Sequence, residues 1–436
     1  MKDVAVIGAG LAGLNCAVRL ENEGLDVALL EAADAPGGRV RTDVVDGFRL
    51  DRGFQVLLTA YPEAQAALDY EGLALKKITP GALVWHAGRF HRFVDPFREP
   101  VAGLKFAFDP IVSFADKLRV ARLRRSVCRS TPADLFEREE ITTATSLARQ
   151  GFSPAILERF FTPFFGGVFL ESELRTSSRY FEFLFRMFAK GDVAVPREGM
   201  EAIPRQLAGK LRPGTLVTNT VVKALRREKL VFAIDVDGTG PLRVRAVVLA
   251  TPEPETRRLL QSLPGATPTK ALAKPRTWNR TTTFYYAADR SPVDEPILML
   301  NGEGRAAGPV NHLMVMSQVS SAYAPAGAHL ISASVVGEAP HADAAMVKLE
   351  QDVRGHLHQW FAEAREWKPL GGFPVQYAVP MQRAAEWEKS NNSVSGKSAA
   401  GIFACGDFLE TASIQGALAS GRRAASAASA ALKRSY

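Results

Sequence analysis

The chain has 436 residues, of which 47% are hydrophobic and 23% charged, and a formal net charge of +8. These proportions are typical of a globular protein, and the length favours two domains. No apolar run approaches the roughly 18 residues of a membrane-spanning helix. The first predicted strand begins at Val4, which leaves no room for a signal peptide, so we expect a cytoplasmic protein. Because Lys and Arg are spread along the chain, nucleic acid is not an expected partner.

Residues 4–13 read VAVIGAGLAG and predict a strand, a tight turn and a helix that ends near Gly24. In such a unit Gly8 permits the turn, Gly10 lets the backbone approach a pyrophosphate, and Gly13 lets helix and strand pack closely. The phosphates then lie at the N-terminus of the helix, where free N–H groups meet the anion. The pattern predicts a dinucleotide site.

A second predicted strand, Asp26–Leu30, ends at Glu31, about 20 residues beyond the glycines. A carboxylate at this distance can accept hydrogen bonds from both ribose hydroxyls of an adenosine. A glycine-rich turn without a ligand is the alternative, and the strand, helix and acid at the right spacing argue against it. These residues alone fit NAD as well as FAD.

The loop after Glu31 contains Gly37, Gly38, Arg39 and Arg41. The paired glycines again allow the backbone to come close to a ligand. Both arginines can face a phosphate group, to which guanidinium binds well.

Cysteine and histidine spacing excludes several kinds of chemistry. Cys16, Cys128 and Cys405 are odd in number and far apart in sequence, which argues against a disulfide framework and against the dithiol reductases. The seven histidines form no Ser-His-Asp set and no metal-ligand spacing, so no metal site is predicted and no catalytic residue is named.

Residues 61–196 differ in composition from the start of the chain. Ten of the 25 phenylalanines lie between Phe152 and Phe188, and both a core helix pair and a pocket for a large apolar substrate would explain them. Before them, Asp116–Arg125 predicts a basic amphipathic helix with Ser113 as its capping residue. A surface helix is the simpler interpretation, and contact with an anionic membrane is the alternative.

Two groups of strands follow. Leu216–Leu225, Leu230–Val236 and Val244–Ala250 predict a sheet that returns to the nucleotide domain. An antiparallel sheet in a second domain is predicted from alternating segments at Thr281–Ala287, Val310–Val319 and His329–Val336. Tyr285 and Tyr286 alternate on the first of these segments, and a core position is favoured over one that faces the cofactor.

The C-terminal region also contains a predicted strand that ends where its backbone can contact a ligand. Gly406 and Asp407 end a predicted strand at 401–407, and the carboxylate can bond a polyol hydroxyl. A helix that opens near Gln415 and Gly416 would direct N–H groups at a ring carbonyl that becomes anionic on reduction. An alanine-rich closing helix follows.

Taken in order, these motifs and Thr251-Pro252 resemble the FAD-dependent superfamily of amine oxidases, protoporphyrinogen oxidases and phytoene desaturases. The resemblance implies an α/β fold with a Rossmann-like FAD-binding domain assembled from separated segments. It also implies an inserted α+β substrate domain with an antiparallel sheet. We expect residues 1–75, 198–260 and 375–436 in the FAD-binding domain and residues 76–197 and 261–374 in the substrate domain.

The resemblance also implies roles for individual residues. Glu31 would bind the adenosine ribose, Arg39 the pyrophosphate side, Val222 the adenine through its backbone, and Asp407 the ribityl chain or pyrophosphate. Gln415, Gly416 and Ala417 would lie beside N1 and O2 of the flavin. The full predicted cofactor set is Gly8, Gly10, Ala12, Gly13, Glu31, Gly38, Arg39, Val222, Gly406, Asp407, Gln415, Gly416 and Ala417.

One departure from the family bears on the substrate. Amine oxidases of this superfamily usually have an aromatic residue where this chain has Ser413, and that residue forms one wall of an amine cage. The segment from Ser413 to Ala417 looks more like that of carotenoid-type desaturases. We therefore favour hydride transfer from a carbon of a hydrophobic molecule to flavin N5, and amine oxidation is the alternative.

Two further expectations follow from the resemblance. No second GxGxxG unit follows the first, so electrons are expected to pass to oxygen or a quinone. The alternative from another class is a binding protein: the Rab GDP-dissociation inhibitors resemble this fold and carry no cofactor. Glu31, Arg39 and Asp407 argue against that role here.

Overall fold

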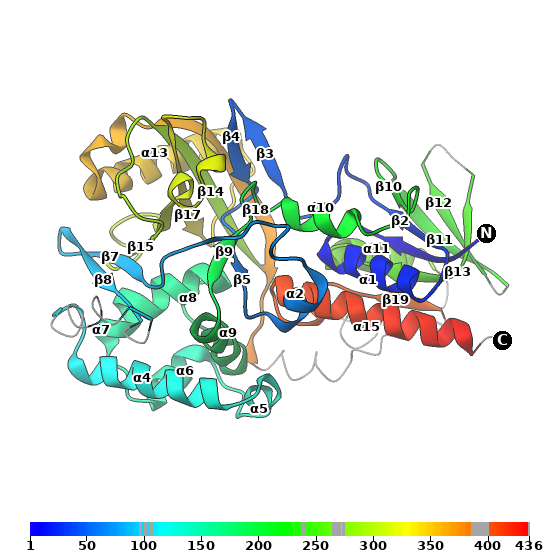
Figure 1. Cartoon of the computed structure of the whole chain (residues 1–436), viewed down its shortest axis with the longest axis horizontal. Coiled ribbons are helices and arrows are strands. Elements are labelled where there is room, and N and C mark those ends of the chain that lie inside the picture. Colours follow the sequence, from blue (N-terminus) through cyan, green and yellow to red (C-terminus); the bar gives the residue numbers. More distant parts are fainter. Residues whose placement is uncertain are drawn as a thin grey trace.

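The computed structural model describes residues 1–95, 98–99, 103, 109–229, 231–237, 240–263, 272, 275–384 and 401–434. Two large sheets and a cluster of helices make up the molecule (Figure 1). The nucleotide turn and both chain termini lie with the first sheet, and the helical cluster lies with the second.

Seven of the described strands form the first sheet, in the order β10-β2-β1-β13-β12-β11 with β19 also paired to β13. Val4–Ile7 within β1 are all buried and pair in parallel with β2 and β13. A parallel sheet covered on both faces needs such a continuous apolar run. The strands are β1 (Lys2–Ile7), β2 (Val27–Leu30), β10 (Leu216–Val217), β11 (Val222–Glu228), β12 (Val231–Val236), β13 (Leu242–Leu249) and β19 (Ile402–Ala404).

The first and last long helices pack against each other beside this sheet, α1 (Leu11–Asn22) against α15 (Ile414–Lys433) (Figure 1). A Cβ on Gly421 would lie 2.2 Å from the carbonyl oxygen of Ala12, so this contact requires glycine. The Asn15 side chain donates a hydrogen bond to the carbonyl of Leu418 across the same contact. This packing brings the C-terminal helix to the nucleotide turn, which explains why motifs at both ends of the chain belong to one site.

The second sheet also has seven described strands, in the order β18-β14-β17-β16-β15-β7-β8. Its pairings are antiparallel except between β15 and β7. Helix α13 (Asp343–Trp360) covers it through Val353, Leu357 and Trp360. The strands are β7 (Ala82–His86), β8 (Arg89–Phe93), β14 (Trp278–Ala288), β15 (Leu298–Asn301), β16 (Val310–Val315), β17 (His329–Val336) and β18 (Lys368–Pro380).

The helical cluster is built around phenylalanine. Phe161, Phe165 and Phe181 are fully buried, and their rings contact one another edge to face or stacked. Thus a helical core accounts for part of the phenylalanine-rich segment. The cluster comprises α4 (Phe114–Arg129), α5 (Pro132–Phe136), α6 (Thr143–Arg149), α7 (Pro154–Ile156), a π-helix (Leu157–Phe161), α8 (Thr162–Phe169) and α9 (Ser178–Lys190).

Helix α4 begins as expected, because the Ser113 hydroxyl accepts a hydrogen bond from the N–H of Asp116 at 3.1 Å. Smaller elements connect the two sheets. They are β3 (Thr42–Val45), β4 (Phe48–Asp51), β5 (Leu57–Leu58), α2 (Pro62–Ala67), β6 (Lys76–Lys77), β9 (Val193–Val195), α10 (Ala202–Ala208), α11 (Glu253–Gln261) and α12 (Met316–Val319).

Several element boundaries differ from expectation. The strand predicted over Leu216–Leu225 is divided into β10 and β11, and the strand predicted over Val310–Val319 ends at Val315, where α12 begins. Strand β18 stays paired with β14 as far as Pro380, so it crosses the expected domain boundary at residues 374 and 375. The domain limits stay a prediction. Leu230 and Gly238, where a strand start and a turn were expected, lie outside the described residues.

Two of the cysteines meet in the fold although they are far apart in sequence. Cys16 on α1 and Cys405 after β19 are both fully buried, and their thiols hydrogen-bond to each other. That contact and burial raise the pKa of Cys16, which keeps the thiol protonated. All three cysteines are free, in agreement with the absence of a disulfide framework expected from the sequence.

Candidate functional site

The turn between β1 and α1 has the geometry of a phosphate site. A Cβ on Gly13 would lie 1.9 Å from the Gly8 carbonyl oxygen, so only glycine fits against the turn. A Cβ on Gly10 would meet no described atom within 4 Å, so the backbone there borders open space. Gly37 donates its N–H to the carbonyl of Ala9, which holds the Gly37-Gly38 loop against the turn. The N-terminus of α1 is thereby presented to a cavity that favours an anion.

Glu31 lies at the end of β2 and lines the same cavity. Its carboxylate accepts hydrogen bonds from the N–H groups of Ala9, at 2.6 Å, and Ala33, at 2.9 Å. Because a carboxylate has about four acceptor positions, both oxygens keep acceptor capacity for ribose hydroxyls.

Arg39 and Asp407 form an ion pair with 2.6 Å between guanidinium and carboxylate. The Arg39 side chain also donates to the carbonyl of Ala378, and its guanidinium lies over the ring of Trp278. Both charged residues line the cavity. Arg41, in contrast, forms an ion pair with Asp34, and the cavity lining does not include it.

Val222, the first residue of β11, lines the cavity beyond Glu31. Its carbonyl oxygen accepts a hydrogen bond from the Arg258 guanidinium at 3.0 Å. Part of the hydrogen-bonding capacity of the Val222 backbone is therefore used within the protein, and its contact with the adenine stays a prediction.

The start of α15 uses several of its hydrogen-bonding groups within the protein. Gly416 donates its N–H to the Ser413 hydroxyl and Ala417 donates to the Ser413 carbonyl. The Gln415 side chain accepts from the N–H of Glu63 and does not line the cavity. Ser413, Ile414 and Ala417 do line it. The roles of Gln415, Gly416 and Ala417 beside the flavin stay a prediction.

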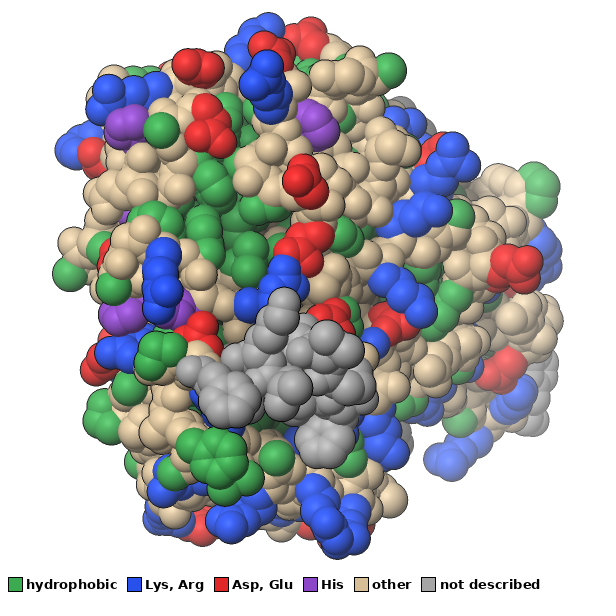
Figure 2. Space-filling model, turned by 60° about the vertical axis from the view of Figure 1, so that its left-hand side comes forward, with side chains coloured by type: hydrophobic (Ala, Val, Ile, Leu, Met, Phe, Trp, Pro, Cys, Tyr) green, Lys and Arg blue, Asp and Glu red, His purple; other side chains and the backbone are tan. Residues whose placement is uncertain are grey.

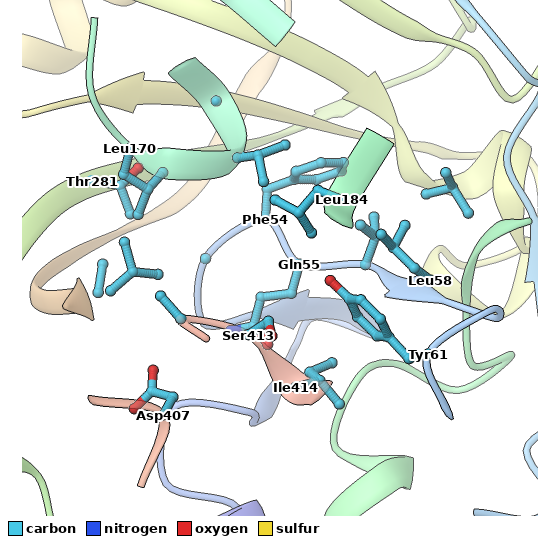
Figure 3. Close-up of a pocket in the computed structure, with 18 of the residues that line it drawn as sticks. Phe54, Gln55, Leu58, Tyr61, Leu170, Leu184, Thr281, Asp407, Ser413 and Ile414 are labelled. Atoms are coloured by element: carbon cyan, nitrogen blue, oxygen red, sulfur yellow. The ribbon is translucent and has the colours of Figure 1, made fainter. Parts of the chain in front are cut away.

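The cavity has a volume of about 950 Å³ and continues from the nucleotide turn into the helical cluster. Of the predicted cofactor residues, ten line it and three do not: Gly13, Gln415 and Gly416 lie outside. Beyond Ser413 the walls become aromatic and aliphatic (Figure 3). Residues of this apolar chamber include Phe54, Leu58, Phe160, Phe164, Leu170, Leu184, Phe185 and Phe188.

Few polar side chains enter the apolar chamber. His312 is fully buried, and burial lowers its pKa to about 4, so the imidazole is uncharged at neutral pH. Its Nδ1 lies 3.0 Å from the Asn311 amide nitrogen, while Nε2 has no hydrogen-bond partner among the described residues. Thr281 donates to the carbonyl of Val335, and Thr283 pairs with Ser334.

The tyrosines of β14 are core residues. Tyr285 is buried and donates to the carbonyl of Asp51 at 2.7 Å. Tyr286 is buried on the α13 side of the sheet, with the Arg354 guanidinium over its ring. Neither lines the cavity.

Three lining residues were not singled out from the sequence. Tyr61, Tyr180 and His312 belong to no motif, and they come from the start of α2, from α9 and from β16. An aromatic residue just before Pro62 was a weak signal at best. Only the packing of these elements around α15 brings the three side chains to one cavity.

Comparisons with known proteins agree with this fold. The family description "Flavin containing amine oxidoreductase" matches residues 11–429. Coproporphyrinogen III oxidase of Mycobacterium leprae is 26% identical over 288 residues, which are 60% of this chain and 62% of that protein. Hydroxyneurosporene desaturase of Rubrivivax gelatinosus is 40% identical over 117 residues, 26% of this chain and 21% of that protein. The chain thus aligns with less than two thirds of either relative.

A solved oxidoreductase from Methanosarcina mazei has the same fold, with a TM-score of 0.74, 16% identity, and coverage of 96% of this chain and 99% of that chain. The family match over most of the chain defines the class of protein. The chain belongs to the flavin-containing amine oxidoreductase family.

Proposed function

We propose that the protein binds FAD along the nucleotide half of the cavity and oxidises a hydrophobic substrate in the apolar chamber. The observation that carries the proposal is the continuity of one cavity from the β1–α1 turn to the phenylalanine walls. Its size and mostly apolar lining are those of a ligand site.

The residues present fit FAD. The open backbone at Gly10 and the N-terminus of α1 suit the pyrophosphate, and Glu31 suits the adenosine ribose. Arg39 and Asp407 together offer a donor and an acceptor to the pyrophosphate and ribityl groups. Val222 lines the same cavity, and we expect its backbone to meet the adenine. Bound FAD would supply hydride acceptance at N5.

The protein's part in the reaction is to hold the substrate and exclude water. Phe54, Leu184 and Ile414 border the space beside Ser413 (Figure 3). A water-poor chamber holds the reacting carbon in one orientation, and orientation supplies much of the rate in hydride transfer. We expect the electrons to leave to oxygen or a quinone.

Two relatives support oxidation of a large organic substrate. One is a coproporphyrinogen III oxidase and the other a hydroxyneurosporene desaturase. Ser413 also favours this function over amine oxidation, since a serine does not form an aromatic wall. Tyr61 and Tyr180 flank Ser413, however, so aromatic rings from other elements keep amine oxidation as the second candidate.

We also propose that helix α4 contacts an anionic membrane. Phe114 and Leu118 are 64% and 54% exposed, and Arg122, Arg125 and Arg129 continue the same exposed side at helical spacing. On the face in Figure 2, Lys and Arg side chains gather beside hydrophobic ones at the lower end, the level of α4 in Figure 1. Such a surface binds anionic lipid.

Helix α4 also borders the cavity, which makes this location useful. Phe114 and Leu118 line the cavity together with Lys117, Val120, Ala121 and Arg124, so the exposed surface of α4 lies at the edge of the cavity. An apolar substrate would then enter from the lipid phase. No helix among the described residues is long and apolar enough to cross a membrane.

The test is anaerobic mixing of the FAD-loaded protein with two compound sets, followed by flavin absorbance. One set contains long isoprenoid hydrocarbons and their oxygenated derivatives, and the other contains simple amines. We expect bleaching only with the first set. Bleaching by amines alone would replace the proposal with amine oxidation.

A further inference from the structure

A cluster of hydroxyl groups interrupts the apolar chamber beside the start of α15. Tyr61, immediately before α2, is buried and lines the chamber, with its ring parallel to that of Phe183 at 6.2 Å. Its hydroxyl hydrogen-bonds to the side chain of Ser413. In Figure 3 this hydroxyl points toward Gln55 and Ser413 and not away from the cavity.

The neighbouring hydroxyl groups have partners within the protein. Tyr180 donates to the carbonyl of Ala412 at 3.0 Å, which uses its only proton, and its hydroxyl also hydrogen-bonds to the Ser413 side chain. Ser413 accepts from the N–H of Gly416 and lies 2.9 Å from the Thr411 hydroxyl. Ser413 therefore keeps its other partners if Tyr61 turns away from it. Tyr61 is the hydroxyl of this cluster that can rotate to a ligand at little cost.

The surroundings keep Tyr61 a donor. Leu58, Leu184 and Ile414 lie around the phenol in the chamber (Figure 3). Burial raises the pKa of Tyr61, so the hydroxyl stays protonated at neutral pH. In an apolar, water-poor space a donor without a matching acceptor is costly, so a ligand that brings an acceptor is favoured.

We propose that Tyr61 is a specificity-determining residue that donates a hydrogen bond to an uncharged oxygen of the substrate, close to Ser413 and Ile414. The ligand class is an apolar molecule with one carbonyl, ether or hydroxyl oxygen near its reacting carbon. A pure hydrocarbon leaves Tyr61 on Ser413 and gains no hydrogen bond from it, and an ammonium group offers no acceptor. The inference rests on the proposed function, because it needs the FAD-loaded cavity to be the substrate site.

Two probes of nearly equal shape test this: 2-acetylnaphthalene, which carries a carbonyl, and 2-isopropenylnaphthalene, in which a CH₂ group replaces the oxygen. Calorimetry on the FAD-loaded protein gives both dissociation constants. We expect the ketone to bind about 3- to 10-fold more tightly, the range of one neutral hydrogen bond. In Tyr61→Phe this preference should fall below about twofold, with hydrocarbon binding unchanged.

Two further variants keep the test decisive. Tyr180→Phe, whose lost hydroxyl bonds a carbonyl of the protein, should keep the ketone preference. Ser413→Ala removes the side chain that competes for the Tyr61 hydroxyl, so the preference for the ketone should be kept or increased. This variant tests the role of Tyr61 if Tyr61→Phe does not fold. A preference unchanged in Tyr61→Phe, or lost in Ser413→Ala, overturns the role of Tyr61.

The outcomes separate this inference from the proposed function. If both probes bind without preference while the flavin is fully loaded, the cavity is a ligand site and only the role of Tyr61 is wrong. If neither probe binds and neither changes the flavin spectrum, the chamber is not the substrate site and the proposed function falls as well.

Discussion

Arg39 and Asp407 are 368 residues apart in sequence, and their side chains meet at 2.6 Å on the wall of the cavity. The Asp407 side chain is only 6% exposed, so its carboxylate meets the Arg39 guanidinium largely out of solvent. The pair joins the loop after β2 to the segment after β19, which are the two ends of the expected cofactor site.

This pair predicts an order of FAD affinities. Arg39→Ala leaves a buried carboxylate unpaired beside the proposed pyrophosphate position, which costs more than removing both charges. We expect Arg39→Ala to weaken FAD by more than tenfold, about 1.4 kcal/mol, and Arg39→Ala with Asp407→Asn to weaken it less. Fluorescence titration of the apoprotein with FAD measures both. Equal affinities in the single and double variants would contradict the coupling.

Asp51 predicts a pH dependence of stability. Burial raises its pKa from 3.8 to about 6, although Thr42 and Tyr323 donate hydrogen bonds to its carboxylate. Since the folded state binds this proton more tightly than the unfolded state, the stabilisation is present below about pH 4 and lost as pH rises through 6. The change is roughly 3 kcal/mol.

Asp51→Asn should remove this pH-dependent contribution to the free energy of unfolding. Urea unfolding of wild type and variant at pH 4.5 and pH 7 isolates it, because the other carboxylates are common to both proteins. We expect the free energy of unfolding of the wild type, relative to Asp51→Asn, to be lower at pH 7 than at pH 4.5. An identical difference at both pH values would refute the raised pKa.

Substitutions at Phe161 and Phe164 test the two explanations for the phenylalanine-rich segment, a helical core and a pocket for an apolar substrate. Phe161 is fully buried in the helical core, whereas Phe164 lines the cavity. Phe161→Ala should lower the free energy of unfolding by about 3 to 5 kcal/mol. Phe164→Ala should cost less stability and change the affinity for apolar ligands. Calorimetric unfolding and ligand titration check both, and a reversed order would show that the roles are exchanged.

Helix α4 predicts binding to anionic vesicles. Replacing Arg122 and Arg125 by Glu should reduce cosedimentation with phosphatidylserine vesicles at least tenfold, since each charge near the surface contributes about 1 kcal/mol. Raising the salt concentration should weaken wild-type binding, because it screens exposed charges. Arg365→Glu with Lys368→Glu makes the same charge change at another exposed site. If this control loses as much vesicle binding, the net charge of the protein is responsible and α4 is not the membrane-binding surface.

The parts of the fold that follow local rules could be predicted from the sequence. The apolar run Val4–Ile7 with its glycines gave β1, the turn and α1, and the Ser113 cap gave the start of α4. Alternating polarity gave β14 and β17. Each depends on residues that are neighbours in the chain.

The contacts that could not be foreseen depend on packing between distant segments. Gln415 is assigned to the flavin by resemblance only, and its side chain accepts a hydrogen bond from the N–H of Glu63 on α2. The contact of Cys16 with Cys405, and that of Tyr61 with Ser413, arise where segments far apart in sequence meet. No local pattern encodes such contacts, so the apolar chamber could not be assembled from the sequence.

FAD binding through Glu31 is the central claim, and one titration tests it most directly. The purified wild-type protein should show flavin absorbance, or take up one FAD per chain on reconstitution. Glu31→Ala should bind FAD at least about tenfold more weakly, because each charge-assisted bond to a ribose hydroxyl contributes roughly 1.5 to 3 kcal/mol. A wild-type protein that takes up no FAD, or a Glu31→Ala variant with unchanged affinity, would contradict the account.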